Sequence, residues 1–181
     1  MASSITFREL THDDLPLIAE IDRSEIIDGQ YTFAQGELTF HAKRIDVQGW
    51  YPGALTDHIA DMGNAITEGG AAFGAFDGEL LVGIVGLNTT PVGGDPGIMQ
   101  LEPLFVSAPY RNKGIGKRLT SLLAERARSL GARALYISSI PTRNSVEAYL
   151  RMGAVPLATP DPVLFEKEPE DIHLILNLDT E

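Results

Sequence analysis

Cysteine is absent from this 181-residue chain, and its absence excludes several classes of protein at once. Without thiols the chain can form no disulfide scaffold, no cysteine nucleophile and no cysteine-based zinc site. Its four histidines, at positions 12, 41, 58 and 173, show no metal-ligand spacing such as H-E-x-x-H. We therefore predict no metal site.

Long apolar runs are also missing. No stretch approaches the roughly 20 residues that a transmembrane helix needs. The first ten residues, MASSITFREL, lack the basic and apolar regions of a secretory signal. These features predict a cytoplasmic protein without a membrane partner, and the length fits one domain over residues 1–181.

Positive charge is scarce. The chain has 14 Lys and Arg residues against 25 Asp and Glu residues, which gives a formal net charge of −11. This balance argues against a nucleic-acid partner, because phosphate contacts need clustered cations. Seven acids and one lysine lie within residues 161–181. This segment has two interpretations: a solvated loop, or a source of negative potential that attracts a cationic substrate.

The apolar residues follow both the strand period and the helix period, which predicts a mixed α/β fold. Strands are expected at residues 5–10, 98–107, 133–140, 154–158 and 172–178, with a hairpin around Asp77-Gly78 within 71–89. Helices are expected after Thr11, at 57–67, at 115–130 with Gly131 as a C-cap, and at 144–152. Residues 27–56 contain several glycines and five aromatic residues and are expected to be irregular.

The stretch SAPYRNKGIGKRL (107–119) holds four of the 14 Lys and Arg residues and two glycines, where the strand predicted at 98–107 leads into a helix. The first N–H groups of a helix lack internal partners and lie at the positive end of its dipole. Gly114 and Gly116 would leave those donors open, and the neighbouring cations would add positive charge. The stretch therefore predicts a polyanion site, most simply for a pyrophosphate. A glycine-relaxed turn with solvated cations is the alternative.

Two familiar phosphate motifs do not fit this stretch. A dinucleotide fingerprint needs a third glycine, but Leu119 stands at that position. A Walker A loop needs glycine where Arg111 stands and Ser or Thr where Arg118 stands.

The ordered motifs over residues 98–154 resemble the GNAT superfamily of N-acetyltransferases. They are an apolar strand, R-x-x-G-x-G at 111–116, an amphipathic helix, a strand, and Y-x-x-x-G at 149–153. The resemblance implies a single-domain, mixed and mostly antiparallel sheet, with central parallel strands that splay apart and helices on its faces. It also implies an acetyl-CoA-dependent N-acetyltransferase.

The resemblance further implies where acetyl-CoA binds. The pyrophosphate would lie on the turn made by Arg111, Asn112, Lys113, Gly114, Ile115, Gly116 and Lys117, and the pantetheine arm on the backbone of Leu104, Phe105 and Val106. Relatives commonly have Asn where this chain has Thr142. Asn144 would supply the missing CoA contact, or form a capping pair with Glu147.

Pro103 lies inside the strand that precedes the glycine turn. Proline cannot donate a ladder hydrogen bond, so pairing should be broken or bulged there. In the resembled family, two parallel strands separate near this point to admit the thioester. A position on an edge strand is the alternative.

The implied reaction is direct attack of a neutral amine on the acetyl thioester. A lysine-like amine is neutral in only about one molecule in 2,500 at pH 7, at a cost of about 4–5 kcal/mol, so a general base is useful. Many relatives have a glutamate where this chain has Gln100. Glu102 lies on the same strand face and is the candidate base, with a surface carboxylate as the alternative. The backbone N–H of Val106 is the candidate oxyanion donor.

Tyr149 matches the tyrosine that relatives place near the CoA sulfur as a general acid. A phenol is a weaker acid than a thiol, so full proton transfer from the tyrosine hydroxyl to the CoA thiolate would be uphill by about 2 kcal/mol. Tyr149 would therefore hydrogen-bond the thiolate or be acidified by its surroundings. Packing beside Val146 and Leu150 is the structural alternative.

The acceptor is expected to be a primary amine of a small molecule or a peptide. The aromatic residues of 27–56 would form one wall of its pocket or pack together as a loop cluster. The acidity of the chain favours a cationic acceptor such as a polyamine, an aminoglycoside or a lysine. Gln100 keeps open a non-catalytic acyl-CoA-binding sensor or interaction module as the alternative function. A transferase for longer acyl groups and a homodimer are further alternatives.

Overall fold

The computed structural model describes residues 4–178. The strands are β1 (Thr6–Glu9), β2 (Glu25–Ala34), β3 (Glu37–Val47), β4 (Ala71–Asp77), β5 (Leu80–Asn88), β6 (Ile98–Val106), β7 (Ala134–Ser139), β8 (Val155–Pro156) and β9 (Ile172–Asn177). The α-helices are α1 (Ala54–Thr67), α2 (Ile115–Ser129), α3 (Arg143–Arg151) and α4 (Pro162–Lys167), and the 3-10 helices are η1 (His12–Glu20) and η2 (Ala108–Tyr110). Asp179 and Glu181 of the acidic segment lie outside the described residues.

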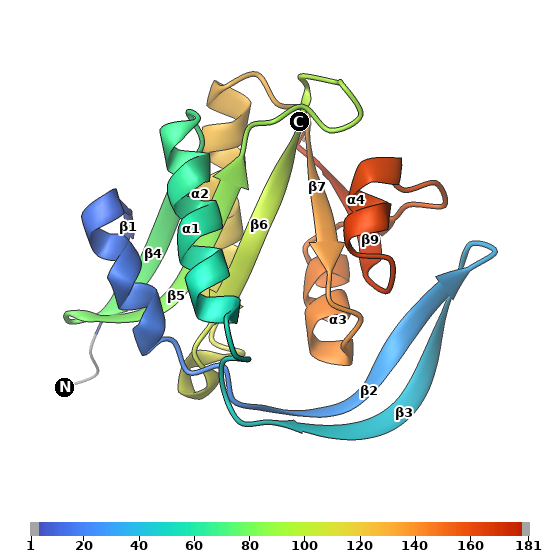
Figure 1. The fold of residues 1–181 in the computed structure, drawn as a ribbon, viewed down its shortest axis with the longest axis horizontal. Helices are drawn as coiled ribbons and strands as arrows, with labels where there is room; N and C mark the ends of the chain where they lie inside the picture. The colour runs from blue at the N-terminus through green and yellow to red at the C-terminus, as the bar shows by residue number, and fades with distance from the viewer. Residues whose placement is uncertain (1–3, 179–181) are drawn as a thin grey trace.

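Seven strands form one mixed sheet in the order β1-β4-β5-β6-β7-β9-β8 (Figure 1). Among residues 4–178, β6 and β7 form the single parallel pair, and the other neighbours in this sheet pair antiparallel. The predicted mixed and mostly antiparallel sheet is therefore confirmed. The predicted hairpin is also confirmed, with β4 and β5 joined by a turn at Gly78 and Glu79.

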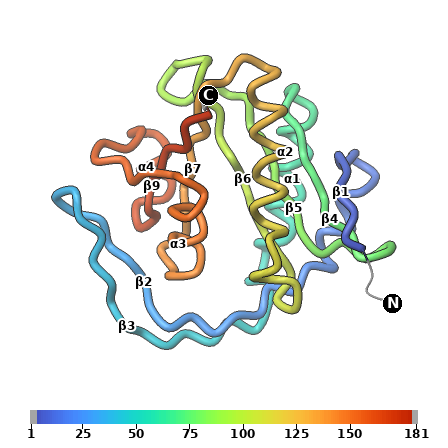
Figure 2. Tube along the Cα trace, turned by 180° about the vertical axis from the view of Figure 1, so that it is seen from behind, coloured from blue at the N-terminus to red at the C-terminus, as the bar shows by residue number. Residues whose placement is uncertain are grey.

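Helices cover both faces of this sheet. η1, α1 and α4 lie on the near face in Figure 1, while α2 and α3 lie on the opposite face, which Figure 2 shows from behind. Leu119, Leu123 and Ala127 recur at every fourth residue of α2 and are fully buried against the sheet. Ile18 of η1 and Met62 of α1 fill a second core on the other face. The two apolar layers hold the central strands rigidly between the helices.

The two central parallel strands separate before they end. β6 pairs with β7 only from Ile98, opposite Ala134, to Leu101, opposite Ile137. β6 then continues to Val106 without a partner on that side, and the strands diverge toward the end of the sheet where α2 and α3 begin (Figure 1). The expected splay of the parallel strands is present.

The expectation of an irregular segment over residues 27–56 is wrong. β2 and β3 form a long antiparallel hairpin outside the main sheet, which curves beneath β6 and α3 in both views (Figures 1 and 2). Gln35 and Gly36 both have positive φ, 53° and 84°, as a two-residue hairpin turn requires. Gly29 lies at a shift of register, where a Cβ would collide with the Phe40 ring. These glycines therefore shape the hairpin instead of ending it.

The acidic segment near the C-terminus contains a helix that the sequence analysis did not predict. The Asp161 carboxylate caps α4 by accepting hydrogen bonds from the N–H groups of Val163 and Leu164, at 3.1 and 3.0 Å. Over the described part of the chain, no helix combines the length and apolar character needed to cross a membrane.

Candidate active site

The gap between β6 and β7 is lined on one side by the backbone of β6. Ser107 donates its N–H to the carbonyl of Val82 in β5, at 2.8 Å. Because backbone groups alternate along a strand, the N–H and C=O groups of Leu104 and the N–H of Val106 point the other way, toward the gap, whereas the Val106 C=O accepts a hydrogen bond from Arg111. This edge can pair with an extended ligand in place of a neighbouring strand.

A β-bulge shapes β6 where the gap opens. The register with β5 shifts there, so that Glu102 and Pro103 together oppose Gly86. A Cβ at Gly86 would collide with the carbonyl oxygen of Glu102, so only glycine fits this position. The predicted interruption at Pro103 is confirmed. The edge-strand alternative is wrong, because β6 lies between β5 and β7.

The glycine turn at residues 111–116 lies at the same end of the sheet. Asn112 and Gly114 adopt left-handed conformations, with φ of 60° and 80°, and Gly114 is the N-cap of α2. Left-handed residues within such a turn direct successive N–H groups to one side and create a concave site for an anion. α2 then begins at Ile115, as the sequence predicts.

The two glycines leave room for an anion at this helix end. A Cβ at Gly114 would meet nothing within 4 Å, although its φ favours glycine. A Cβ at Gly116 would make only ordinary contacts, 3.8 Å from the side chains of Leu104 and Val106. The protein's own packing therefore does not require glycine at position 116. A glycine here leaves the N–H groups of the first helical turn open to solvent.

The arginine of the turn differs in role from the lysines around it. Arg111 donates from Nε to the carbonyl of Val106 at 3.0 Å, and from Nη1 to the carbonyl of Ser24 at 2.9 Å. Its guanidinium thus braces the turn against β6 and the start of β2. Lys113 and Lys117 are exposed, and within residues 4–178 neither forms an ion pair. These lysines provide the positive charge that faces solvent.

Tyr149 on α3 is buried, with 8% of its surface exposed. Its hydroxyl forms no hydrogen bond with the described residues, although its ring packs in the core beside Val146. Burial raises the pKa of this hydroxyl, and the nearby Asp171 carboxylate raises it further. The surroundings therefore do not acidify Tyr149. They keep it protonated, as a hydrogen-bond donor.

Asp171 is a second ionisable group beside Tyr149, and the sequence analysis counted it only as part of the acidic segment. It precedes β9, whose first residue, Ile172, pairs with the last residue of β7, Ser139. Asp171 therefore lies at the end of β7 that has separated from β6. Burial raises the pKa of Asp171 to about 7, with a further contribution from the neighbouring acids of its own segment. No sequence motif marks it, since its burial depends on the tertiary fold.

Glu102 lies on the α1 side of the sheet. Lys167 of α4 donates a hydrogen bond to its carboxylate across 3.4 Å, and this ion pair joins α4 to β6. The pair borders a polar cavity of about 210 Å³. The other residues of the cavity are Asp61, Asn64, Ala65, Glu68 and Asn88. Gln100 is buried, with only 6% of its surface exposed.

Thr142 and Asn144 lie at the start of α3, on the far side of the gap. Thr142 is buried, is the N-cap of the helix, and donates its hydroxyl hydrogen to Ser145 at 3.1 Å. Asn144 donates to the Glu25 carboxylate at 2.7 Å, and that carboxylate also lies 3.9 Å from Arg111. Asn144 is therefore not the helix cap. Glu25 instead links the start of α3 to the glycine turn.

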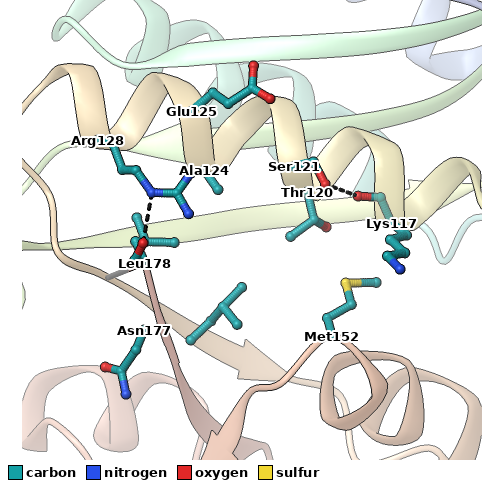
Figure 3. Close-up of a pocket in the computed structure, with 10 residues that line it drawn as sticks. Lys117, Thr120, Ser121, Ala124, Glu125, Arg128, Met152, Asn177 and Leu178 are labelled. Atoms are coloured by element: carbon teal, nitrogen blue, oxygen red, sulfur yellow. Dashed lines mark hydrogen bonds between the residues drawn. The ribbon is translucent and has the colours of Figure 1, made fainter. Parts of the chain in front are cut away.

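A groove of about 320 Å³ runs along α2 on the face opposite to Glu102 (Figure 3). Lys117, Thr120 and Ser121 of α2 form one wall, and Met152 and Leu176 lie across from them. In Figure 3 the Lys117 and Met152 side chains point toward one another at the end of the groove near the glycine turn. The site thus has two faces, a groove beside the turn and an acidic cavity beyond the gap.

This combination of a splayed parallel pair and a glycine turn defines an acyl-CoA-type transferase site. The Acetyltransferase (GNAT) family model matches residues 37–154, and the chain belongs to this family of acetyltransferases. No curated relative matches the chain. Within the part of the chain that the structure describes, no group of three or more ligating side chains could hold a metal ion.

Solved structures of acetyltransferases share the fold. A candidate streptothricin acetyltransferase from Bacillus anthracis, in complex with acetyl coenzyme A, has a TM-score of 0.75 and 19% identity over 97% of this chain and 99% of that chain. Nourseothricin acetyltransferase has a TM-score of 0.70 and 19% identity, over 96% and 98%. PaiA N-acetyltransferase from Thermoplasma acidophilum, in complex with coenzyme A, has a TM-score of 0.63 and 16% identity, over 96% of this chain and 99% of that chain.

Proposed function

We propose that this protein is an acetyl-CoA-dependent N-acetyltransferase that modifies a primary amine of a small molecule or peptide. The observation that carries the proposal is the helix end at Gly116, where the protein's own packing leaves space for a side chain that the sequence does not supply. It lies beside the unpaired edge of β6. A pyrophosphate-bearing thioester with an extended arm suits both features. Complexes with acetyl coenzyme A and coenzyme A among proteins of the same fold also support it.

The residues that would hold acetyl-CoA come from three elements. The backbone of 111–117 and the exposed lysines would bind the pyrophosphate, and the backbone of 104–106 would pair with the pantetheine arm. Thr142 and Asn144 border the gap from α3, although both side chains are already hydrogen bonded within the protein. When bound, acetyl-CoA supplies an activated acetyl group as a thioester.

The acceptor must lose a proton before its nitrogen can attack. Asp171 is the stronger candidate for the base, because a group with a pKa of about 7 is half ionised at neutral pH and can accept a proton there. Glu102 remains a second candidate. Its ion pair with Lys167 favours a role in shaping the acidic cavity. The raised pKa of Tyr149 supports hydrogen bonding to the leaving sulfur instead of full proton transfer.

Release of free thiol from acetyl-CoA in the presence of a panel of amines tests the proposal directly. The chain contains no cysteine, so every thiol detected is released CoA. Thiol release with one class of amine is the expected result. A rise in melting temperature with acetyl-CoA, but no thiol release with any amine, would instead support the acyl-CoA-binding module.

A further inference from the structure

Arg23 occupies a fixed position beside the end of β6. The segment that joins η1 to β2 crosses this strand end and is tied to it on both sides of Arg23. Asp22 donates its N–H to the Ser107 hydroxyl at 2.9 Å and accepts from the Ala108 N–H at 3.0 Å. On the other side, the Ser24 carbonyl accepts from Arg111. These bonds hold the Arg23 backbone next to the glycine turn and the gap.

Aromatic rings position the Arg23 side chain. Its guanidinium carbon lies 3.6 Å from the centre of the Phe105 ring and 5.2 Å from that of Trp50. The two rings pack edge to face at 5.4 Å, and Trp50 donates its indole N–H to the Ile21 carbonyl at 3.1 Å. His58 closes the cluster, 4.9 Å from Phe105. A guanidinium stacked on rings in this way keeps its N–H donors at the rim of the stack.

Within residues 4–178, the Arg23 guanidinium has no carboxylate in ion-pair contact. Among the described residues it forms neither an ion pair nor a hydrogen bond, and it stacks on the two rings. Glu25 acts on it electrostatically, but that carboxylate is engaged by Asn144 and lies beside Arg111. Burial, together with the charge of Arg111, lowers the pKa of Arg23 to about 10. A partly buried cation without a partner is costly unless a ligand supplies the anion.

The Arg23 cluster lies on the α1 side of the sheet, away from α2. Phe105 and Trp50 pack with the α1 core, whereas Leu104 and Val106 pack with α2, where the pyrophosphate turn begins. Successive β6 residues thus divide the two faces. The polar cavity around Glu102 opens on the same α1 side as Arg23. An anion held by Arg23 would therefore lie on the side of the acidic cavity, across the sheet from the groove along α2.

We propose that Arg23 binds a carboxylate of the acceptor, so that the substrate is an amine that also carries a carboxylate, such as an amino acid. The inference rests on the proposed N-acetyltransferase function. The fork of guanidinium donors suits a planar carboxylate, and the aromatic stack keeps the fork in place. The same donors could also meet a phosphate of acetyl-CoA, and the test is designed to separate these two sources.

The test compares each of the twenty amino acids with its own carboxamide, which keeps the amine and the side chain but lacks the charge. Thermal stabilisation in the presence of CoA measures binding, and thiol release from acetyl-CoA measures turnover. For the preferred side chain, wild-type protein should bind and turn over the acid roughly 10- to 100-fold better than the amide, as expected for a hydrogen bond to a charged group. Arg23→Gln should abolish that preference and leave the amide unchanged. Arg44→Gln, an exposed arginine of β3, is the control and should retain it.

Three other outcomes would overturn the inference. Equal binding of acids and amides by wild-type protein would show that Arg23 does not bind a carboxylate of the acceptor, even if the protein acetylates amines. An equal loss for acids and amides in Arg23→Gln, with weaker acetyl-CoA binding, would assign the anion to the cofactor. An acid preference that Arg23→Gln retains would show that another residue binds the carboxylate. Carboxylate-dependent binding without thiol release would instead keep the inference and reject the proposed activity.

Discussion

At the residue scale, the raised pKa of Asp171 makes the chemistry testable by pH. An ionised Asp171 is needed to accept the amine proton, so the rate ratio of wild type to Asp171→Asn should increase as pH rises through about 7. The effect of acceptor ionisation on the rate is the same for both proteins and cancels in this ratio. We expect a plateau above pH 8 at about 100-fold or more, in the usual range of general-base catalysis. A ratio that does not change with pH would contradict the assignment.

Asp171→Asn, which should lower the rate, should raise the melting temperature at high pH. The pKa of Asp171 is higher in the folded state, about 7, than in an unfolded chain, about 3.9, so folding binds the proton more tightly. Its contribution to the free energy of unfolding is therefore complete below pH 4 and is lost as pH rises to 7. Asparagine cannot ionise, so Asp171→Asn should melt higher than wild type at pH 8 and equally at pH 4. A variant that loses both activity and stability at pH 8 would point to a structural role.

Tyr149→Phe tests the leaving-group side of the reaction. The ring is buried and would remain in place, while the hydroxyl that forms no hydrogen bond with described residues is removed. Turnover at saturating substrate should fall by about 10- to 100-fold, because a hydrogen bond to the developing thiolate is lost. The dissociation constant for acetyl-CoA, measured by calorimetry, should not change. Unchanged turnover would remove Tyr149 from the mechanism.

At the scale of elements, two glycines on either side of β6 allow a matched comparison. Gly116→Ala adds a methyl group that the protein accommodates, and alanine favours a helix over glycine by about 1 kcal/mol. This variant should melt no lower than wild type without ligand but lose most of its stabilisation by acetyl-CoA. Gly86→Ala should instead melt markedly lower, because its Cβ would collide with the Glu102 carbonyl. Full acetyl-CoA stabilisation of Gly116→Ala would mean that this helix end does not bind the pyrophosphate.

The elements that sequence could predict are those governed by local pattern. The amphipathic helix α2, the β4–β5 hairpin and the bulge at Pro103 each have a local cause, and all are present. The β2–β3 hairpin was missed because Gly29 resembles a strand breaker until the Phe40 ring above it is known. Arg23 and Asp171 were missed for a related reason. Their significance comes from burial and from distant neighbours, which a single sequence does not display.

At the scale of the whole molecule, an excess of negative charge surrounds a small basic turn. The formal net charge is −11, and the described part of the acidic segment forms α4 and leads into β9 beside the site. The segment is therefore more than a solvated loop, since its lysine pairs with Glu102 and its Asp171 lies near Tyr149. The electric field of such a charge excess concentrates ligands of opposite charge near the protein, and it acts over about 10 Å at 0.1 M salt.

Ionic strength should therefore affect acceptors according to their net charge. For a diamine, kcat/KM should fall by about 10-fold between about 0.01 and 0.3 M salt, because screening weakens the attraction that raises its local concentration. The amino acid with the same side-chain amine carries one fewer net positive charge and should show a shallower slope. Its carboxylate contact with Arg23 is short-ranged and partly buried, so salt should weaken it little. Equal slopes for the two acceptors would show that the excess acidity does not steer the substrate, and that recognition resides in the contacts at the site alone.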